Sequence, residues 1–280
     1  GRFESVRSDD SEIHLGAFAA ETDNAAIENC TNRAEIVVAD AADATPRTMI
    51  LSGFVGKAFN GVTLRNCRNT GNISFSSPAL YMIGGFVGAV QEDDGLYTIA
   101  DCHNTADFDN AGSNSGWNFM GGIAGKTISR QLVPGETSNY RLIVEECSST
   151  GTISIAGPSK VRASGIVAQT QGAYRISGCT FSGAIESTDV TKRDVVIGGI
   201  MAMADKECVG LVEGCTFSGR ISAAQAGANN FFGGIYGNNG GAASVVNDCR
   251  TTASAYVGCP IGKSVGMLAG RPNKKGFTVS

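Results

Sequence analysis

The sequence predicts an all-β protein, a parallel β-helix (β-solenoid) of about seven to eight three-strand coils, and three observations lead to this prediction. First, seven of the nine cysteines recur at spacings of 37, 35, 45, 32, 36 and 34 residues. Second, each of these cysteines lies in the same short pattern of apolar and small residues. Third, a glycine-rich block precedes each pattern. Self-similarity at such a period is typical of solenoids and other repeat architectures.

The pattern around each cysteine predicts two strands per unit. The recurring cysteines are Cys30, Cys67, Cys102, Cys147, Cys179, Cys215 and Cys249. An aliphatic residue precedes each by three positions, Gly or Ala follows by four, and Ile or Phe follows by six in all units but the last. These residues favour strands, and no ten-residue stretch keeps helical spacing. We therefore expect one strand to end at the cysteine and another to follow the small residue.

The glycine-rich block supplies the first strand of each unit. It reads Ser-Gly-Phe-Val-Gly at 52–56, Gly-Gly-Phe-Val-Gly at 84–88 and Gly-Gly-Ile-Ala-Gly at 121–125, with further copies along the chain. Three strands separated by turns describe a triangular coil, whereas a propeller blade needs four antiparallel strands. We expect right-handed coils, because crossovers between parallel strands are nearly always right-handed.

The residue before each cysteine predicts a turn. These residues are Asn29, Asn66, Asp101, Glu146, Gly178, Gly214 and Asp248. Most are types that tolerate a left-handed backbone, and a turn there would point both the aliphatic residue and the cysteine inward. The seven sulfurs would then form a column of reduced thiols about 4.8 Å apart, too far apart for bridged Cβ atoms at about 3.8 Å. Cys208 and Cys259 lie outside this column, and their pairing stays open.

Stacked side chains and the chain ends complete the predicted fold. Two positions after the cysteine, successive units repeat the same residue, which in-register coils favour. These residues are Asn32, Asn69 and Asn104, and then Phe181 and Phe217. We expect residues 1–12 to form an N-terminal leader or cap and residues 13–280 a single solenoid domain. The last residues resemble the start of another strand, so we expect the natural protein to continue.

Composition narrows the function classes. The net charge of −4 gives no electrostatic reason to expect a nucleic-acid partner. The longest apolar stretch, 195–204, is too short to predict a transmembrane segment. Only two histidines are present and no Cys-x-x-Cys pair occurs, so neither a metal site nor a cofactor is expected. Gly125-Lys126-Thr127 is similar to part of a phosphate-binding loop, but Met120 replaces the required glycine.

The full array resembles the GLUG-type repeats of bacterial surface proteins, including adhesin-like proteins of gut Bacteroidales and the repeat regions of immunoglobulin A proteases. Residues 84–88 with Cys102, and 121–153, carry the pattern best, and the likeness covers about 13–270. The resemblance implies structural and adhesive repeats at an extracellular or outer-membrane-associated location. It carries over no catalytic residue, because this chain has no His-Glu-x-x-His sequence.

Three functions follow as hypotheses. The first is a non-enzymatic, exported, adhesin-like solenoid that presents an extended binding or assembly surface. Its partner would be a host glycan or matrix protein, or another domain of the same surface protein. The second is a carbohydrate-active β-helix enzyme, with Asp101 and Glu146 as acids in equivalent columns of adjacent units. The third is a purely structural spacer.

Two surfaces are candidate binding sites. Alternation predicts an outward apolar stripe on the first strands, formed by Ile50, Met82, Phe119, Val196 and Phe231 and interrupted by Arg162. After the glycine block, Val55 and its equivalents Val87, Val167, Met201 and Tyr236 are also expected to face out. A continuous exposed apolar surface is typical of a docking face or of a face covered by another segment.

The two longest arcs between the glycine block and the cysteine belong to adjacent units and should emerge on one side. Binding is often placed on such insertions. The candidate residues are Glu92, Asp93, Asp94, Tyr97, Arg130, Tyr140 and Arg141, with Trp117 near the other end of the strand. The three acids could supply oxygen ligands to a hard cation, but their spacing matches no known loop and acidic turns are commonly just solvated.

Overall fold

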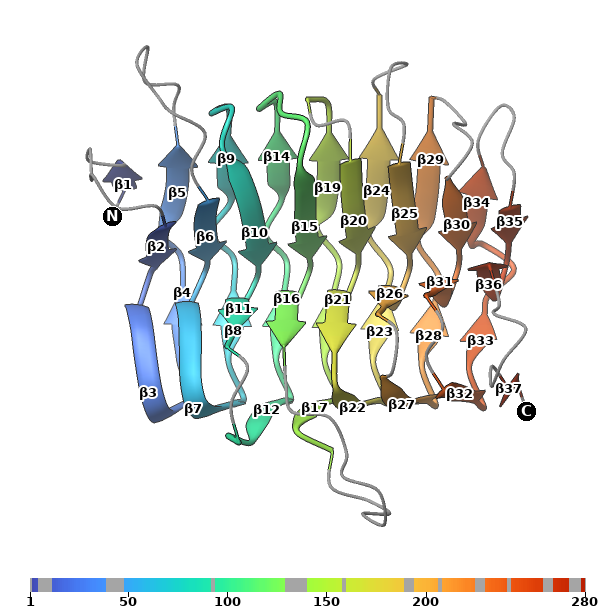
Figure 1. The fold of residues 1–280 in the computed structure, drawn as a ribbon, viewed down its shortest axis with the longest axis horizontal. Helices are drawn as coiled ribbons and strands as arrows, with labels where there is room; N and C mark the ends of the chain where they lie inside the picture. Colours follow the sequence, from blue (N-terminus) through green and yellow to red (C-terminus); the bar gives the residue numbers. More distant parts are fainter. Residues whose placement is uncertain are drawn as a thin grey trace.

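The computed structural model is a parallel β-solenoid in which successive copies of the repeat lie side by side along one long axis (Figure 1). It describes residues 2–4, 12–38, 48–91, 94–128, 140–157, 160–188, 194–205, 208–224, 230–240, 243–258, 264–271 and 278–279. Every regular element in these residues is a β-strand, and all their pairings are parallel. The strands form four sheets.

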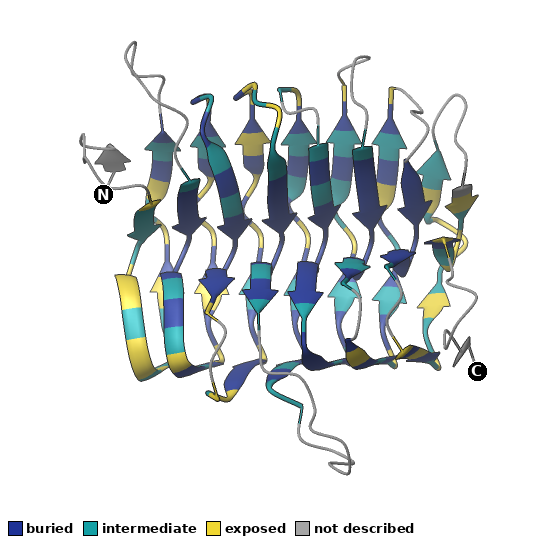
Figure 2. Cartoon of the chain, in the orientation of Figure 1, coloured by how far each residue is buried: buried dark blue, intermediate teal, exposed yellow. Residues whose placement is uncertain are grey.

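The front sheet contains the strands that lead into the glycine-rich blocks. It consists of β2 (Glu12–Gly16), β6 (Thr48–Ser52), β10 (Leu80–Gly84), β15 (Trp117–Gly121), β20 (Lys160–Ser164), β25 (Asp194–Gly198), β30 (Phe231–Gly233) and β35 (Ser264–Gly266). Figure 2 shows that its middle strands are almost entirely buried.

The base sheet contains the strands on either side of the variable arc. It consists of β3 (Ala19–Glu28), β7 (Val55–Arg65), β11 (Val87–Val90), β12 (Tyr97–Ala100), β16 (Ala124–Ile128), β17 (Leu142–Glu145), β21 (Val167–Gln171), β22 (Ala173–Ser177), β26 (Met201–Ala204), β27 (Val209–Glu213), β31 (Tyr236–Asn239), β32 (Ala243–Asn247), β36 (Ala269–Arg271) and β37 (Thr278–Val279). The long strands β3 and β7 run through the arc and join both halves into one sheet.

Two further sheets close the coil. The corner sheet, directly after the cysteines, consists of β4 (Thr31–Asn32), β8 (Arg68–Asn69), β13 (His103–Asn104), β18 (Ser148–Ser149), β23 (Thr180–Phe181), β28 (Thr216–Phe217) and β33 (Arg250–Thr251). The back sheet consists of β1 (Arg2–Glu4), β5 (Glu35–Val38), β9 (Ile73–Phe75), β14 (Phe108–Asn110), β19 (Thr152–Ile155), β24 (Ala184–Ser187), β29 (Arg220–Ala223) and β34 (Tyr256–Gly258). Of the predicted N-terminal cap, residues 2–4 therefore form an edge strand of this sheet.

The prediction of three strands per unit is wrong. The unit from β10 to β14 contains five strands, because the glycine-rich block divides the first strand and the cysteine is followed by the two-residue strand β13. The backbone bends at Gly85 and Phe86, between β10 and β11. A bend of this kind sends the two halves of the predicted strand into different sheets.

The predicted left-handed turns are confirmed at all seven positions. The φ angles before the cysteines lie between 48° and 62°, as at Asn66 (48°) and Gly178 (62°). Asn, Asp and Gly adopt this region at low cost. Glu146, with a φ of 52°, is the exception, because its side chain is longer than those of the other turn residues. The turn points both the residue three before the cysteine and the cysteine itself into the core, as Val144 and Cys147 show.

The cysteine column is confirmed as a set of reduced, inward-facing thiols. Five are at most 1% exposed, namely Cys67, Cys102, Cys147, Cys179 and Cys215, and the end members Cys30 and Cys249 are half-buried. Each sulfur is hydrogen-bonded within the stack; the Cys147 thiol donates to the Ile99 carbonyl of the preceding coil at 3.4 Å. Burial raises the pKa of the Cys147 and Cys179 thiols well above the ordinary value. Cys208 is buried outside this column, where its thiol donates to the Thr170 carbonyl at 3.6 Å, and Cys259 lies outside the described residues.

The predicted side-chain ladder is also confirmed. The Asn32 amide donates to Asn69 at 2.9 Å, and the Asn69 amide donates to Asn104 at 2.8 Å. Further along the same column, the rings of Phe181 and Phe217 stack with their centroids 6.0 Å apart. Buried amides are stable in such a column because each one satisfies its neighbour.

The prediction that Val55 and its equivalents face outward is wrong. Val55, Val87, Val167, Met201 and Tyr236 are at most 1% exposed and belong to the main core. The bend in the glycine-rich block is the physical reason, because the alternation of a strand does not continue across a bend. At such a corner, adjacent residues such as Phe54 and Val55 both point inward.

Candidate functional site

The predicted apolar stripe lies outside the main core but is not an exposed surface, so that prediction needs correction. Its members lie in one register column of the front sheet. Ile50, Met82 and Phe119 are direct neighbours, as are Val196 and Phe231, and Arg162 of β20 separates the two groups. However, Ile50 is 1% exposed, Val196 3%, Phe119 5% and Phe231 8%, and only Met82 is half-buried. The stripe is therefore not the open apolar docking face that the alternation predicted.

A column of small residues covers the stripe. A Cβ added to Gly88 of β11 would lie 2.7 Å from Cγ2 of Ile50, and one added to Gly237 of β31 would lie 2.9 Å from Cγ1 of Val196. The absence of side chains here lets the base sheet approach the outer side of the front sheet closely. The bend in the glycine-rich block thus makes the outer surface concave.

A second column of side chains forms the other wall of this concave surface. Its residues are paired in register along the base sheet and are Lys57, Ala89, Lys126, Gln169, Met203 and Asn238. Arg162 of β20 occupies the stripe position between Phe119 and Val196. We call the surface between this column and the stripe the front groove. It runs across the strands, along the long axis of the solenoid.

The middle of the front groove opens into a cleft of about 370 Å³. Its lining combines apolar, aromatic and cationic side chains: Thr48, Leu80, Tyr81, Met82, Trp117, Phe119, Lys126, Arg162 and Gln169. Trp117, predicted as a binding residue, therefore belongs to this cleft. Sites for organic ligands typically combine apolar walls with a few placed polar groups.

Cations and aromatic rings are paired in the cleft. The Arg162 guanidinium lies 4.3 Å from the centroid of the Trp117 ring and 5.6 Å from that of Phe119. The Lys126 ammonium lies 5.4 Å from the Phe119 centroid, and the Lys160 ammonium lies 6.0 Å from that of Trp117. Such contacts stabilise a cation by roughly 0.5–2 kcal/mol. They hold three positive side chains around one pair of rings.

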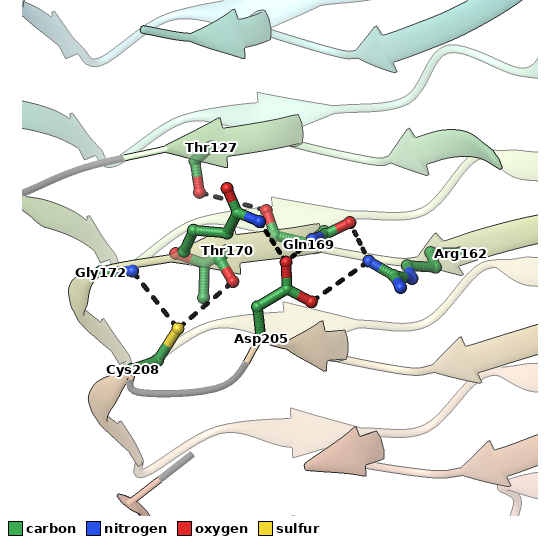
Figure 3. Close-up of polar contacts among 8 residues, drawn as sticks. Thr127, Arg162, Gln169, Thr170, Gly172, Asp205 and Cys208 are labelled. Carbon is green, nitrogen blue, oxygen red and sulfur yellow. Dashed lines mark hydrogen bonds and ion pairs between the residues drawn. The ribbon is translucent and has the colours of Figure 1, made fainter. Parts of the chain in front are cut away.

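A polar network behind the cleft holds Arg162 in place (Figure 3). Its Nη1 donates to the Gln169 side chain and, at 3.4 Å, to the Asp205 carboxylate. Asp205 also accepts hydrogen bonds from the amides of Gln169 and Gln171. The carboxylate is thus shared among three donors and neutralises the guanidinium only in part. The Nε of Arg162 is buried and has no acceptor in the described part of the chain.

Lys126 is a half-buried cation of the cleft. Burial lowers the pKa of its ammonium group from the ordinary value; the charge of Asp205 acts in the opposite direction, Arg162 lowers the pKa further, and Glu12 raises it. Among the described residues, no carboxylate forms an ion pair with it. A half-buried cation without a partner is a site where an anion gains electrostatic energy.

The N-terminal end of the groove differs from its middle because its charges are paired. Lys57 forms an ion pair with Glu12 at 2.8 Å, and His14 contacts Glu12 at 3.1 Å and Glu21 at 2.6 Å. The hydrogen bond from Lys57 lowers the pKa of the Glu12 carboxyl most, while partial burial acts against it. Lys57 and Lys126 thus occupy the same column in opposite electrostatic situations.

The strands that follow the two long arcs, β12 and β17, pair in register in the base sheet. Residues 92–93 and 129–139 of the arcs lie outside the described residues, and the prediction that the arcs emerge on one side falls on them. The Tyr97 amide donates to the Arg141 carbonyl at 2.8 Å, and the Arg141 guanidinium donates to the Asp94 carbonyl at 3.2 Å. Tyr140 and Arg141 line a second cleft, of about 650 Å³, with Leu96. Glu92, Asp93 and Arg130 lie outside the described residues.

The prediction that Tyr97 is a binding residue on the surface is wrong. Its side chain is 0% exposed, and its hydroxyl donates to the Gln91 carbonyl at 3.3 Å. Tyr97 begins β12 two positions before the core residue Ile99, so alternation points both inward. It packs in the core and is not available to a ligand on the surface.

The two acids considered for catalysis lie on the outer turn before the cysteine column. Asp101 and Glu146 have φ angles of 52°, and both are exposed. Glu146 lines a shallow depression with Glu213, Asp248 and Arg250, none of which lines the front-groove cleft. The acids therefore do not converge on the cleft.

No group of three or more His, Cys, Asp or Glu side chains is arranged to hold a metal ion in the described ranges. Within the same ranges, no helix is long and apolar enough to span a membrane.

Sequence reasoning missed Lys126 and Gln169, which line the cleft, and Asp205, which holds Arg162 from behind it. Arg162 was the available signal, because it interrupts an otherwise apolar column. The position of Lys126 opposite it depends on where the glycine-rich block bends, which the pattern did not reveal.

No protein-family model, no curated protein and no solved structure matches this chain.

Proposed function

We propose that the protein is a non-enzymatic, exported, adhesin-like β-solenoid of a bacterial cell surface, and that the front groove is its binding surface. The observation that carries this proposal is the cleft at the centre of the groove, whose lining combines aromatic rings with incompletely neutralised cations. The resemblance to GLUG-type repeats supports the surface location and the adhesive role.

The contrast between interior and exterior also supports recognition. The inward columns repeat from coil to coil, as the cysteines do, whereas the groove column changes from Lys126 to Gln169 to Met203 in three successive strands. In a solenoid each coil contacts only its neighbours, so outward residues can vary without disturbing the core. Such a surface is suited to binding a particular partner.

The placement of the acids fits binding better than glycan cleavage. Glycosidases place two carboxylates on either side of the scissile bond, about 5–10 Å apart. Asp101 and Glu146 are exposed turn residues away from the cleft, and Asp205 is engaged by Arg162 and two glutamine amides.

A binding screen with a groove variant tests the proposal. Wild-type protein is passed over immobilised glycans and matrix proteins beside two variants. Met82→Glu adds a negative charge to the cleft, and Ser154→Glu is a matched substitution on the outer face of the back sheet. We expect a specific hit that Met82→Glu loses and Ser154→Glu keeps. Release of reducing ends or unsaturated products from any bound glycan would instead establish the enzymatic hypothesis. Absence of any hit would favour a spacer.

For the architecture, we propose seven to eight right-handed coils. The seven cysteines, one per coil, and the eight strands of the front and back sheets support the number, and the general preference for right-handed crossovers supports the handedness. An experimental density map traced along the cysteine column tests both.

A further inference from the structure

The front-groove cleft carries more positive than negative charge. Lys126 and Arg162 both line it, and Lys160 lies beside it over the Trp117 ring. In the part of the chain that the structure describes, Asp205 is the carboxylate that forms an ion pair with one of these cations, Arg162, and it is already shared with two glutamine amides. Glu12 also attracts Lys126 but forms no ion pair with it. Neither lysine has an ion-pair partner among those residues. The positive electrostatic potential in such a cleft favours the binding of an anionic ligand.

The chemistry of the two cations indicates an oxyanion. Arg162 is fixed by its contacts with the Trp117 ring and with Asp205, so its guanidinium is oriented before a ligand arrives. A fixed guanidinium can donate two parallel hydrogen bonds to two oxygens of a carboxylate or of a sulfate, and an ammonium group such as that of Lys126 adds a point charge. Thr48 provides a neutral hydrogen-bonding group in the same cleft for hydroxyls.

The direction of the groove favours a glycan over a peptide. Extended peptides usually bind sheets by adding a strand to a free edge. The strands that form the cleft, β10, β15 and β20, are each paired on both sides and offer no edge. The groove instead crosses the strands, whose spacing is about 4.8 Å, close to the length that one sugar residue adds to an extended chain. Consecutive sugars could therefore meet consecutive coils.

We propose that the cleft binds an acidic sugar residue of an extended anionic glycan, with the carboxylate or sulfate between Lys126 and Arg162 and the sugar ring against Met82 and Leu80. This inference rests on the proposed function, because it names the ligand class of the front groove. It also assigns Lys126 as the residue that determines charge selectivity.

The test compares two lysines of one column. Lys126→Met removes the unpaired charge but keeps an apolar stem against Phe119. Lys57→Met removes a charge that is already paired with Glu12 and does not line the cleft. Binding to polygalacturonate oligomers, dextran sulfate, neutral dextran and polyglutamate is measured by calorimetry at two salt concentrations. We expect an acidic glycan to bind, Lys126→Met to weaken it by roughly tenfold, and Lys57→Met to change it by less than about twofold. The polygalacturonate and dextran sulfate arms separate carboxylate from sulfate recognition. Thermal unfolding followed by circular dichroism confirms that both variants are folded.

Several results would overturn the inference. Equal binding of neutral dextran would show that charge does not select the ligand, and tighter binding of polyglutamate would assign the cleft to an acidic peptide. If an acidic glycan bound with equal affinity to Lys126→Met, the cleft assignment would fail. Binding to none of the four probes would reject the acidic-glycan class. In each case, a hit in the wider screen that Met82→Glu loses would leave the proposed function standing.

Discussion

Replacing Gly214 with alanine isolates the left-handed turn that orients the cysteine column. Gly214 has a φ of 60°, and an added Cβ would have its nearest neighbour, the backbone nitrogen of Gly178, at 3.8 Å. The new methyl group therefore meets no steric obstacle, and backbone strain alone decides the result. A left-handed alanine costs about 1–2 kcal/mol, while the stiffer unfolded chain returns about 0.4–1 kcal/mol. We expect a net loss of about 1 kcal/mol in the free energy of unfolding.

Urea unfolding followed by circular dichroism measures this loss, with two comparison variants. Gly214→Asn should lose less than Gly214→Ala, because asparagine visits the left-handed region more readily. Ser222→Ala, on an ordinary strand of the back sheet, should be nearly neutral. If alanine proved as stable as glycine at position 214, the left-handed turn would carry no cost, and the reasoning that turns each cysteine inward would be refuted.

Three further predictions concern the column, the ladder and the groove. Burial raises the pKa of the Cys67 thiol, so it and the other buried column thiols should resist alkylation at pH 8 and react after unfolding; free reaction in the native state would contradict the stacking. Asn69→Ala removes one partner of each neighbouring ladder amide. It should lower the free energy of unfolding, measured with urea, by about 1–3 kcal/mol for each buried group left unpaired. An unchanged free energy would show that the ladder bonds do not contribute to stability. The pKa of Glu12 is lowered by Lys57, so their interaction stabilises the fold fully above the ordinary pKa of 4.5, and this stability is lost as the pH falls through the lowered pKa. Glu12→Gln should therefore flatten the acid side of the profile of stability against pH. An unchanged slope would argue against the ion pair.

The features that the sequence predicted correctly are those decided by local chemistry repeated many times. Asn, Asp and Gly before the cysteines indicate a left-handed turn wherever they stand, and seven copies in register made the inward column predictable. The Asn and Phe ladders were visible for the same reason, since in-register stacking places identical residues on top of one another.

Most of the errors arise at the glycine-rich block. Alternation assigns the residues of one strand to two faces, but a bend at Gly53 and Phe54 resets that assignment. The sequence shows that glycine permits a bend without showing its direction. The division of the first strand, the burial of Val55 and the covering of the stripe all depend on that direction. The cleft was missed for the same reason, because Lys126 faces Phe119 and Arg162 only after the chain has bent.

The bend links the repeat to the proposed function. A straight strand at the glycine-rich block would leave Ile50 and Phe119 open to solvent, whereas the bend covers them and sets cationic side chains along one rim. The glycine column repeats because every coil must bend, while the rim is free to differ from coil to coil. Recognition should therefore depend on the rim and stability on the glycines. Substituting Gly88 with valine, whose Cβ alone would lie 2.7–2.8 Å from Ile50 and from backbone oxygens, should destabilise the fold, whereas Lys126→Met should leave the unfolding midpoint nearly unchanged and alter binding. If the two substitutions had the opposite effects, the division between a structural bend and a recognition rim would be wrong.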